Sequence, residues 1–184
     1  MTLAPQFWWH LSRASGFVSW ILLTASLLWG VLLFTRALKH VDRPSWLLEM
    51  HIWLSGLAIV TMIVHLVALV FDNYLVFSWK EILVPGGSPW KTVPIAFGVV
   101  AFWLLMTIQI TASLRKFLPR KLWRSLHLLS YAAWWMVSLH AGLAGTDVTH
   151  RAYQAVALAL TAAAISATFL RVVAPRRRGR VDNL

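Results

Sequence analysis

The chain has 184 residues, of which 59% are hydrophobic and only 12% are charged, and its formal net charge is +11. A soluble domain is usually close to half apolar and about a quarter charged, so this composition excludes an ordinary soluble protein and indicates a membrane protein. The chain contains no cysteine, which excludes disulfides and thiolate metal sites. In a soluble protein the positive charge would suggest nucleic acid, but in a membrane protein basic residues act as topology signals, so no nucleic-acid partner is expected.

Five long uncharged stretches follow one another along the chain. A transmembrane helix needs roughly 20 such residues to cross a hydrocarbon core of ~30 Å. We therefore predict an all-α membrane protein, a five-helix bundle that forms a single domain over residues 1–184, with a basic cytoplasmic tail at 174–184 and no soluble domain. The first stretch lacks the basic start and clear cleavage site of a secretory signal, so we expect it to remain in the protein. The predicted helices cover about 16–34, 50–71, 92–114, 125–146 and 152–171.

The connection between the second and third stretches is the one with room for structure of its own. Its segment FSWKEILVP combines apolar residues with Lys80 and Glu81, and we predict a short amphipathic helix on the outer surface there. The following PGGSP, Pro85–Pro89, is typical of a turn that ends such a helix.

Basic residues predict the orientation in the membrane. Thirteen Lys and Arg lie on the side of the first loop, the third loop and the tail, whereas four lie on the other side. The positive-inside rule then places the N-terminus outside and the C-terminus in the cytoplasm, as in a multi-pass protein of the cell membrane. The four on the outer side are Arg13, Lys80, Lys91 and Arg151.

Four of the seven histidines lie within predicted spans, where ionisable side chains are costly and usually mark a site. They form the patterns H-x13-H, at His51 and His65, and H-x12-H, at His127 and His140. At 1.5 Å rise per residue the members of a pattern are separated by ~21 Å and ~19.5 Å along the helix. The other three, His10, His40 and His150, fall in predicted termini or loops, where a solvated side chain is the expected role.

The second and fourth spans are predicted to run in the same direction, so their histidines meet at two depths. His51 and His127 lie near the cytoplasmic side, and His65 and His140 lie near the outer side. Two facing imidazoles with a flat space between them are typical of a bis-histidine heme site. Zinc is the competing interpretation, but it prefers three or four protein ligands at each depth.

The two spacings do not turn a helix by the same angle. On an ideal helix His51 and His65 lie about 40° apart in azimuth, whereas His127 and His140 lie about 140° apart. We therefore expect either a local distortion of the fourth helix between Leu128 and Ser138 or a strong tilt.

The paired histidines on co-directional spans, together with WHLSRASGF and HLLSYAAWWMVSLHAGLAG, resemble the ferric-reductase-like transmembrane family, and especially its bacterial members. That family includes the NADPH oxidases and the heme subunit of the methionine sulfoxide reductase system. The resemblance implies two heme b groups, the inner one held by His51 and His127 and the outer one by His65 and His140. It also implies that Arg13, in the SRASG context, lies beside the outer heme or at the acceptor site, with an ordinary interfacial arginine as the alternative.

Two departures from the oxidases limit what the resemblance implies. The oxidases have a further histidine near the oxygen site, and here that position is Leu69, so dedicated superoxide production is not expected. The chain also has no Gly-rich nucleotide loop, and the family's common six-helix form is reduced to five predicted helices. We expect an oxidoreductase or electron-transfer subunit that lacks its own flavin and NAD(P)H domain.

The expected function is transmembrane electron transfer from a separate cytoplasmic donor, a flavoprotein, reduced flavin or quinol, to an extracytoplasmic acceptor. That acceptor is a ferric chelate, a flavoprotein or a reductase partner. The alternatives are a heme-less membrane anchor or assembly subunit and, less favoured, a metal transporter. Further candidates, each with an ordinary packing or interfacial role as its alternative, are Arg43, Arg124, Lys91 and Arg151 beside heme propionates and Trp134 or Trp135 between the hemes.

Overall fold

The computed structural model describes residues 6–35, 44–73, 75 and 77–173, and these residues are all-helical, without strands. The prediction of an all-α protein is therefore confirmed. Two of the residues considered above, His40 and Arg43, lie outside the described residues, as does the basic tail at 174–184. The helices are α1 (Phe7–Thr35), α2 (Pro44–Phe71), α3 (Trp79–Leu83), α4 (Thr92–Ser113), α5 (Arg120–Ala144) and α6 (Arg151–Val173).

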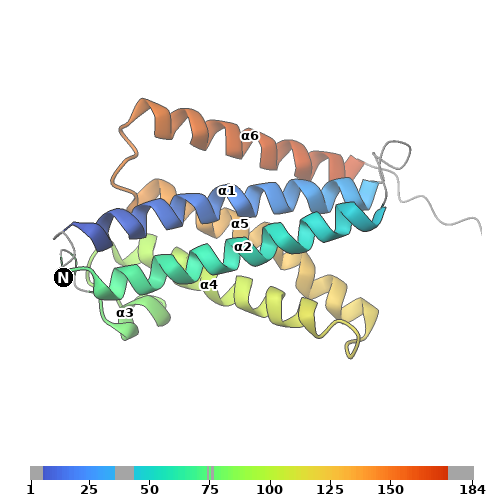
Figure 1. Cartoon of the computed structure of the whole chain (residues 1–184), viewed down its shortest axis with the longest axis horizontal. Helices are drawn as coiled ribbons and strands as arrows, with labels where there is room; N and C mark the ends of the chain where they lie inside the picture. Colours follow the sequence, from blue (N-terminus) through green and yellow to red (C-terminus); the bar gives the residue numbers. More distant parts are fainter. Residues whose placement is uncertain (1–5, 36–43, 74, 76, 174–184) are drawn as a thin grey trace, which may run out of the picture.

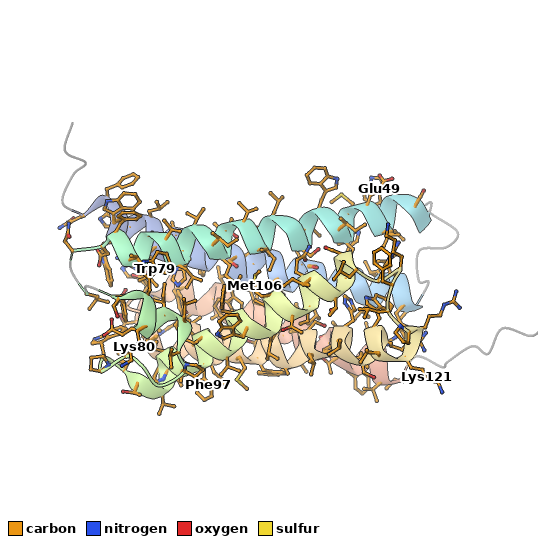
Figure 2. The ribbon with its side chains drawn as sticks, turned by 90° about the horizontal axis from the view of Figure 1, so that it is seen from below. Glu49, Trp79, Lys80, Phe97, Met106 and Lys121 are labelled. Atoms are coloured by element: carbon orange, nitrogen blue, oxygen red, sulfur yellow. The ribbon has the colours of Figure 1, made fainter. Side chains whose placement is uncertain are left out.

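The five long helices lie roughly along one axis and alternate in direction (Figure 1). α1, α4 and α6 run one way, and α2 and α5 run the other way, so the two histidine helices are co-directional as predicted. α1 packs mainly along α2, α4 packs mainly along α5, and α6 packs on α1. Figure 2 shows Glu49 and Lys121 at one end of the bundle and Trp79 and Lys80 at the other.

Four of these helices, α1, α2, α4 and α6, are long and apolar enough to cross a membrane. Their outward faces are apolar as well, since Trp53 and Leu158 are 69% and 72% exposed, which is unfavourable in water and suits lipid. The described helices thus suit a multi-pass membrane protein. α5 is not among the four, because it is less apolar overall than they are.

Several helices extend beyond the predicted uncharged stretches. α1 begins at Phe7 rather than at residue 16, because the charge of Arg13 does not end the helix: its guanidinium is paired with Asp147. α2 begins at Pro44, a residue whose fixed φ and missing N–H suit the first turn of a helix. α5 ends at Ala144 rather than at residue 146, and the backbone N–H of Gly145 closes its last turn on Ala141.

The short connection between α2 and α4 folds as predicted. α3 is preceded by Ser78, whose backbone N–H and hydroxyl both donate to the Glu81 carboxylate, so the start of the helix is capped. Ile82 is buried while Trp79 is 55% exposed, which gives the helix its two faces. Ile82 joins a cluster of buried residues on α4 and α5 and so packs α3 against the end of the α4–α5 pair where α4 begins and α5 ends.

Small polar residues allow α1 to approach α2 closely. Serine and threonine satisfy their hydroxyls on helix carbonyls, and Ser19 Oγ donates across the interface to the Ala58 carbonyl at 3.0 Å. In membranes, helices associate through such small residues because their backbones can come near one another. The buried members on α1 are Ser12, Ser15, Ser19, Thr24 and Ser26.

Two indole hydrogen bonds connect α1 to α5. Trp134 Nε1 donates to Thr24 Oγ1 at 2.8 Å, and Trp20 Nε1 donates to Ser138 Oγ at 3.0 Å. Trp134 is only 2% exposed, whereas its neighbour Trp135 is 42% exposed. Trp134 thus serves core packing between the two helix pairs, which was the alternative role given for it from the sequence.

Removing the acceptor of the buried indole tests this connection. Thr24→Val leaves Trp134 Nε1 without a partner in the core, and we expect a loss of about 1–2 kcal/mol in the free energy of unfolding. Thr107→Val is the matched control, because Thr107 also bonds the carbonyl four residues earlier but lies on an exposed face. Thermal or denaturant unfolding in detergent measures both, and equal stability of the two variants would contradict the role of this hydrogen bond.

Candidate functional site

The four histidines of α2 and α5 meet in two pairs between these helices. The ring centroids of His51 and His127 are 6.0 Å apart with an interplanar angle of 72°. Those of His65 and His140 are 6.4 Å apart with an angle of 76°. These are the pairs that the sequence predicted, one at each depth of the bundle.

The centroid separations suit one metal ion between the two rings of each pair. Imidazole nitrogens bind first-row metals at about 2.0–2.1 Å and lie about 1.1 Å from the ring centre, so two rings on opposite sides of a metal have centroids about 6.3 Å apart. The observed values of 6.0 and 6.4 Å bracket this distance. The gap in each pair is therefore wide enough for two ligands of one metal ion, and it also lies within the range of about 4.5–7 Å for an edge-to-face contact between two rings.

α1 fixes the two imidazoles of α2 through its backbone. His65 Nδ1 lies 2.7 Å from the carbonyl oxygen of Ser12, and His51 Nδ1 lies 3.0 Å from that of Ser26. A carbonyl only accepts hydrogen bonds, so the proton of each ring is on Nδ1. Nε2 is then the unprotonated nitrogen, which is the one available to a metal.

The two imidazoles of α5 differ from each other. His140 Nδ1 donates to the carbonyl oxygen of Pro94 on α4 at 2.9 Å. His127 Nδ1 is buried and has no hydrogen-bond partner within the described part of the chain. The ring of His127 instead stacks on Trp123, with centroids 5.2 Å apart and an interplanar angle of 22°.

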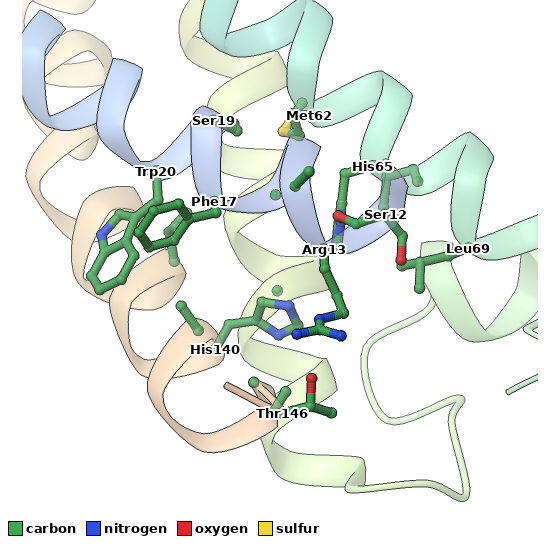
Figure 3. Close-up of a pocket in the computed structure, with 18 of the residues that line it drawn as sticks. Ser12, Arg13, Phe17, Ser19, Trp20, Met62, His65, Leu69, His140 and Thr146 are labelled. Carbon is green, nitrogen blue, oxygen red and sulfur yellow. The ribbon is translucent and has the colours of Figure 1, made fainter. Parts of the chain in front are cut away.

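A cavity of about 660 Å³ lies beside the His65–His140 pair. Its volume is within the range of about 300–1,000 Å³ that holds cofactors and drug-sized ligands. The lining is mostly apolar and aromatic, with a few polar groups at its outer end. Figure 3 shows His65, His140, Arg13, Phe17, Trp20 and Leu69 around this space.

Arg13 and Asp147 form an ion pair at the outer end of the cavity. Arg13 Nε donates to Asp147 Oδ2 at 2.9 Å, and Nη2 contacts Oδ1, so the pair has two contacts. The Arg13 guanidinium also lies 5.7 Å from the centre of the Trp9 ring. The hydrogen bond from Arg13 lowers the pKa of the Asp147 carboxyl below its ordinary value of 3.8. The pair connects α1 to the segment between α5 and α6.

Some residues of the site were not found from the sequence. Asp147 was missed, although it is the sole acidic residue between the fourth and fifth predicted spans, which was an available signal. Arg171 was counted only as a basic residue of the tail side. Its guanidinium lies 3.0 Å from the centre of the Phe34 ring, and it acts electrostatically on His127 and Tyr131.

The other basic candidates have different positions. Lys91 Nζ donates to the carbonyls of Leu143 and Ala144 at 3.0 and 3.4 Å, so it caps the end of α5. Arg124 and Arg151 are exposed. Of the four residues considered beside propionates, Lys91 thus has a structural role at the outer end.

Of the two adjustments expected for the fourth span, a local distortion or a tilt, the structure has the tilt. α5 is helical without interruption from Arg120 to Ala144, so the local distortion predicted between Leu128 and Ser138 is not present. α5 crosses α2 at a clear inclination in Figure 1. Because the two axes diverge, His127 and His140 can both reach α2 from different sides of α5.

Across residues 6–35, 44–73, 75 and 77–173, no three His, Asp or Glu side chains gather as a metal site. Each depth offers two imidazoles, which is too few for a tetrahedral zinc site built by this chain alone. A metal ion at either pair would need further ligands from outside the described residues.

No family model, curated protein or solved structure matches this chain. The resemblance described from the sequence therefore depends on the histidine spacing and the quoted segments.

The Arg13–Asp147 pair predicts a pH dependence of stability. Because the folded pKa of Asp147 is lowered, its stabilising contribution is fully present above pH ~4 and is lost as pH falls through that lowered pKa. We expect Asp147→Asn to lower the melting temperature at pH 7, and this difference from wild type to shrink below pH ~4. An Arg13→Gln background is the control, because Asp147→Asn should have little effect there. A full effect in that background would contradict the pairing.

Proposed function

We propose that this chain is a membrane electron-transfer protein of the ferric-reductase-like kind that holds two heme b groups. The observation that carries the proposal is the meeting of two imidazole pairs at centroid separations of 6.0 and 6.4 Å on co-directional helices. His51 and His127 would hold the inner heme, and His65 and His140 the outer one.

The donor set fits a heme better than a bare metal ion. A porphyrin brings four equatorial nitrogens, so two protein ligands complete the iron, which is the number available at each depth. Three of the four rings have Nδ1 engaged on a backbone carbonyl and so present Nε2. When bound, a heme between two imidazoles supplies a one-electron carrier without an open iron position.

The proposal requires α5 to be the fifth membrane crossing. α5 lies along α4 and carries His127 and His140 on one continuous helix. Its length matches that of its neighbours. Its charged residues, Arg120, Lys121 and Arg124, are confined to its first turns, where long basic side chains reach the membrane surface. The apolar remainder crosses the membrane beside α4.

The orientation follows from the basic residues. The end of the bundle with the α4–α5 connection is rich in Lys and Arg, and the opposite end holds α3. The positive-inside rule favours a cytoplasmic location for the first end, with the N-terminus outside. His51 and His127 then lie toward the cytoplasm, and Arg13, Asp147 and the cavity lie toward the outside, in the cell membrane of a bacterium.

The partners are defined by what these 184 residues do not supply. The sequence contains no Gly-rich nucleotide loop, so we propose a donor outside these residues, a flavoprotein, reduced flavin or quinol, on the cytoplasmic side. The acceptor is extracytoplasmic, a ferric chelate, a flavoprotein or a reductase partner. The chain holds the imidazoles in place and excludes water between the two depths.

A spectrum of the purified protein tests the proposal. We expect about two hemes per chain by pyridine hemochrome and a reduced α band of the b type. His65→Ala should lower the heme content to about one per chain, because an axial ligand of the outer pair is lost. His40→Ala is the control, since that residue falls in a predicted loop, and it should retain both hemes.

The result separates this function from the alternatives. A colourless pure protein would leave a heme-less anchor or assembly subunit, or a transporter, and would end the proposal. Retention of both hemes in His65→Ala would show that the ligand pairs are assigned incorrectly.

A further inference from the structure

Three of the four imidazoles rest on the same backbone arrangement of a neighbouring helix. A carbonyl accepts the hydrogen bond from Nδ1, and a glycine four residues later faces the ring itself. We call this arrangement a ring seat. The seats are Ser12 and Gly16 for His65, Ser26 and Gly30 for His51, and Pro94 and Gly98 for His140.

How strictly each seat requires a glycine depends on the distance between an added Cβ and the imidazole ring. A Cβ at Gly98 would lie 2.7 Å from His140 Nδ1, and one at Gly16 would lie 2.9 Å from His65 Nδ1. Both are below the closest approach that real Cβ atoms make, so the ring would have to move. A Cβ at Gly30 would lie 3.4 Å from His51 Cε1, which is close to ordinary contact. The two outer seats are therefore strict, and the inner one is tolerant.

The two seats on α1 repeat at the interval of the histidines they hold. Ser12 to Ser26 and Gly16 to Gly30 each cover the same number of positions as His51 to His65, because α1 and α2 are antiparallel partners. The repeat has a simple physical cause: an equal rise along both helices brings the second carbonyl and glycine to the second ring.

His127 has no ring seat. Its Nδ1 is buried without a hydrogen-bond partner among the residues that the structure describes, and its closest ring neighbour is the face of Trp123. Stacking restrains the plane of an imidazole less than a hydrogen bond along a fixed carbonyl direction does. Nothing comparable to the other three seats sets the direction of its Nε2.

We infer that the ring seats are positioning residues for the axial imidazoles, and that the outer site is fixed on both sides whereas the inner site is fixed on one. The inference rests on the proposed heme function, which it deepens. In each seat the carbonyl accepts the hydrogen bond that keeps the proton on Nδ1 and so directs Nε2 away from the helix, and the glycine lets the ring lie against the helix backbone. The outer pair has two such rings, while the inner pair combines seated His51 with unseated His127.

Glycine substitutions test the seats. We expect Gly98→Ala and Gly16→Ala to lose the outer heme, with heme content falling from about two to about one per chain, and Gly30→Ala to retain both. Gly142→Ala on α5 and Gly56→Ala on α2 are matched controls, because a Cβ at either helical position meets nothing within 4 Å. The controls should keep the wild-type heme content and spectrum.

The outcomes separate failure of this inference from failure of the proposed function. A colourless wild type sinks the proposed function. A wild type with two hemes, together with Gly98→Ala and Gly16→Ala variants that match the controls, sinks the seats alone. Loss of both hemes in these two variants would also overturn the inference, because the seats are argued to act on the outer pair only.

Electron paramagnetic resonance tests the asymmetry independently of heme content. The double variant His65→Ala/His140→Ala keeps only the inner pair, and His51→Ala/His127→Ala keeps only the outer pair. In the ferric state we expect a narrow low-spin signal from the outer pair, whose ring planes are fixed, and a broader one from the inner pair, where His127 adopts a range of orientations. Equal widths, or a broader outer signal, would overturn the asymmetry.

Discussion

An imidazole inside an apolar helix bundle must satisfy its Nδ1 proton without water, and in this protein the backbone of a neighbouring helix does so for three rings out of four. A carbonyl within a helix already accepts one hydrogen bond, but it has a second lone pair. At Gly16 and Gly98 the ring reaches that lone pair only because the facing residue has no side chain, whereas the contact at Gly30 is less close. The close packing of α1 on α2, and of α4 on α5, therefore brings the backbone of one helix within hydrogen-bond reach of the imidazoles of the other.

The space between the two helix pairs follows from the same arrangement. α1 holds the rings of α2 from behind and α4 holds one ring of α5 from behind, so the Nε2 sides of the rings face each other across a gap. Indole hydrogen bonds from Trp134 and Trp20 connect α1 to α5 and set how far apart the pairs lie. The separation suits axial ligation because the helix spacing and the ring orientation are fixed together.

Charge is distributed differently at the two ends of the bundle. At the outer end Arg13 is neutralised by Asp147 beside the cavity, and Lys91 is engaged by the last carbonyls of α5. At the other end Arg171 of α6 brings a positive charge close to His127. The outer site is thus built from paired groups and strict ring seats, while at the inner site the buried Nδ1 of His127 has no hydrogen-bond partner within the described residues. The two ends that differ in this way are also the ends that we propose face the electron donor and the electron acceptor.

The sequence by itself determined the helical class, the apolar stretches and the histidine pairs, because hydrophobic runs and a rise of 1.5 Å per residue are local properties. It did not reveal the extension of α1 through Arg13, because the charge is tolerated only through Asp147, which lies 134 positions away. It also left the fourth helix undecided between distortion and tilt, since azimuth depends on how two axes cross. The ring seats at Gly16, Gly30 and Gly98 were decided by tertiary structure alone: a glycine in a helix has no visible purpose until the residue packed against it is known.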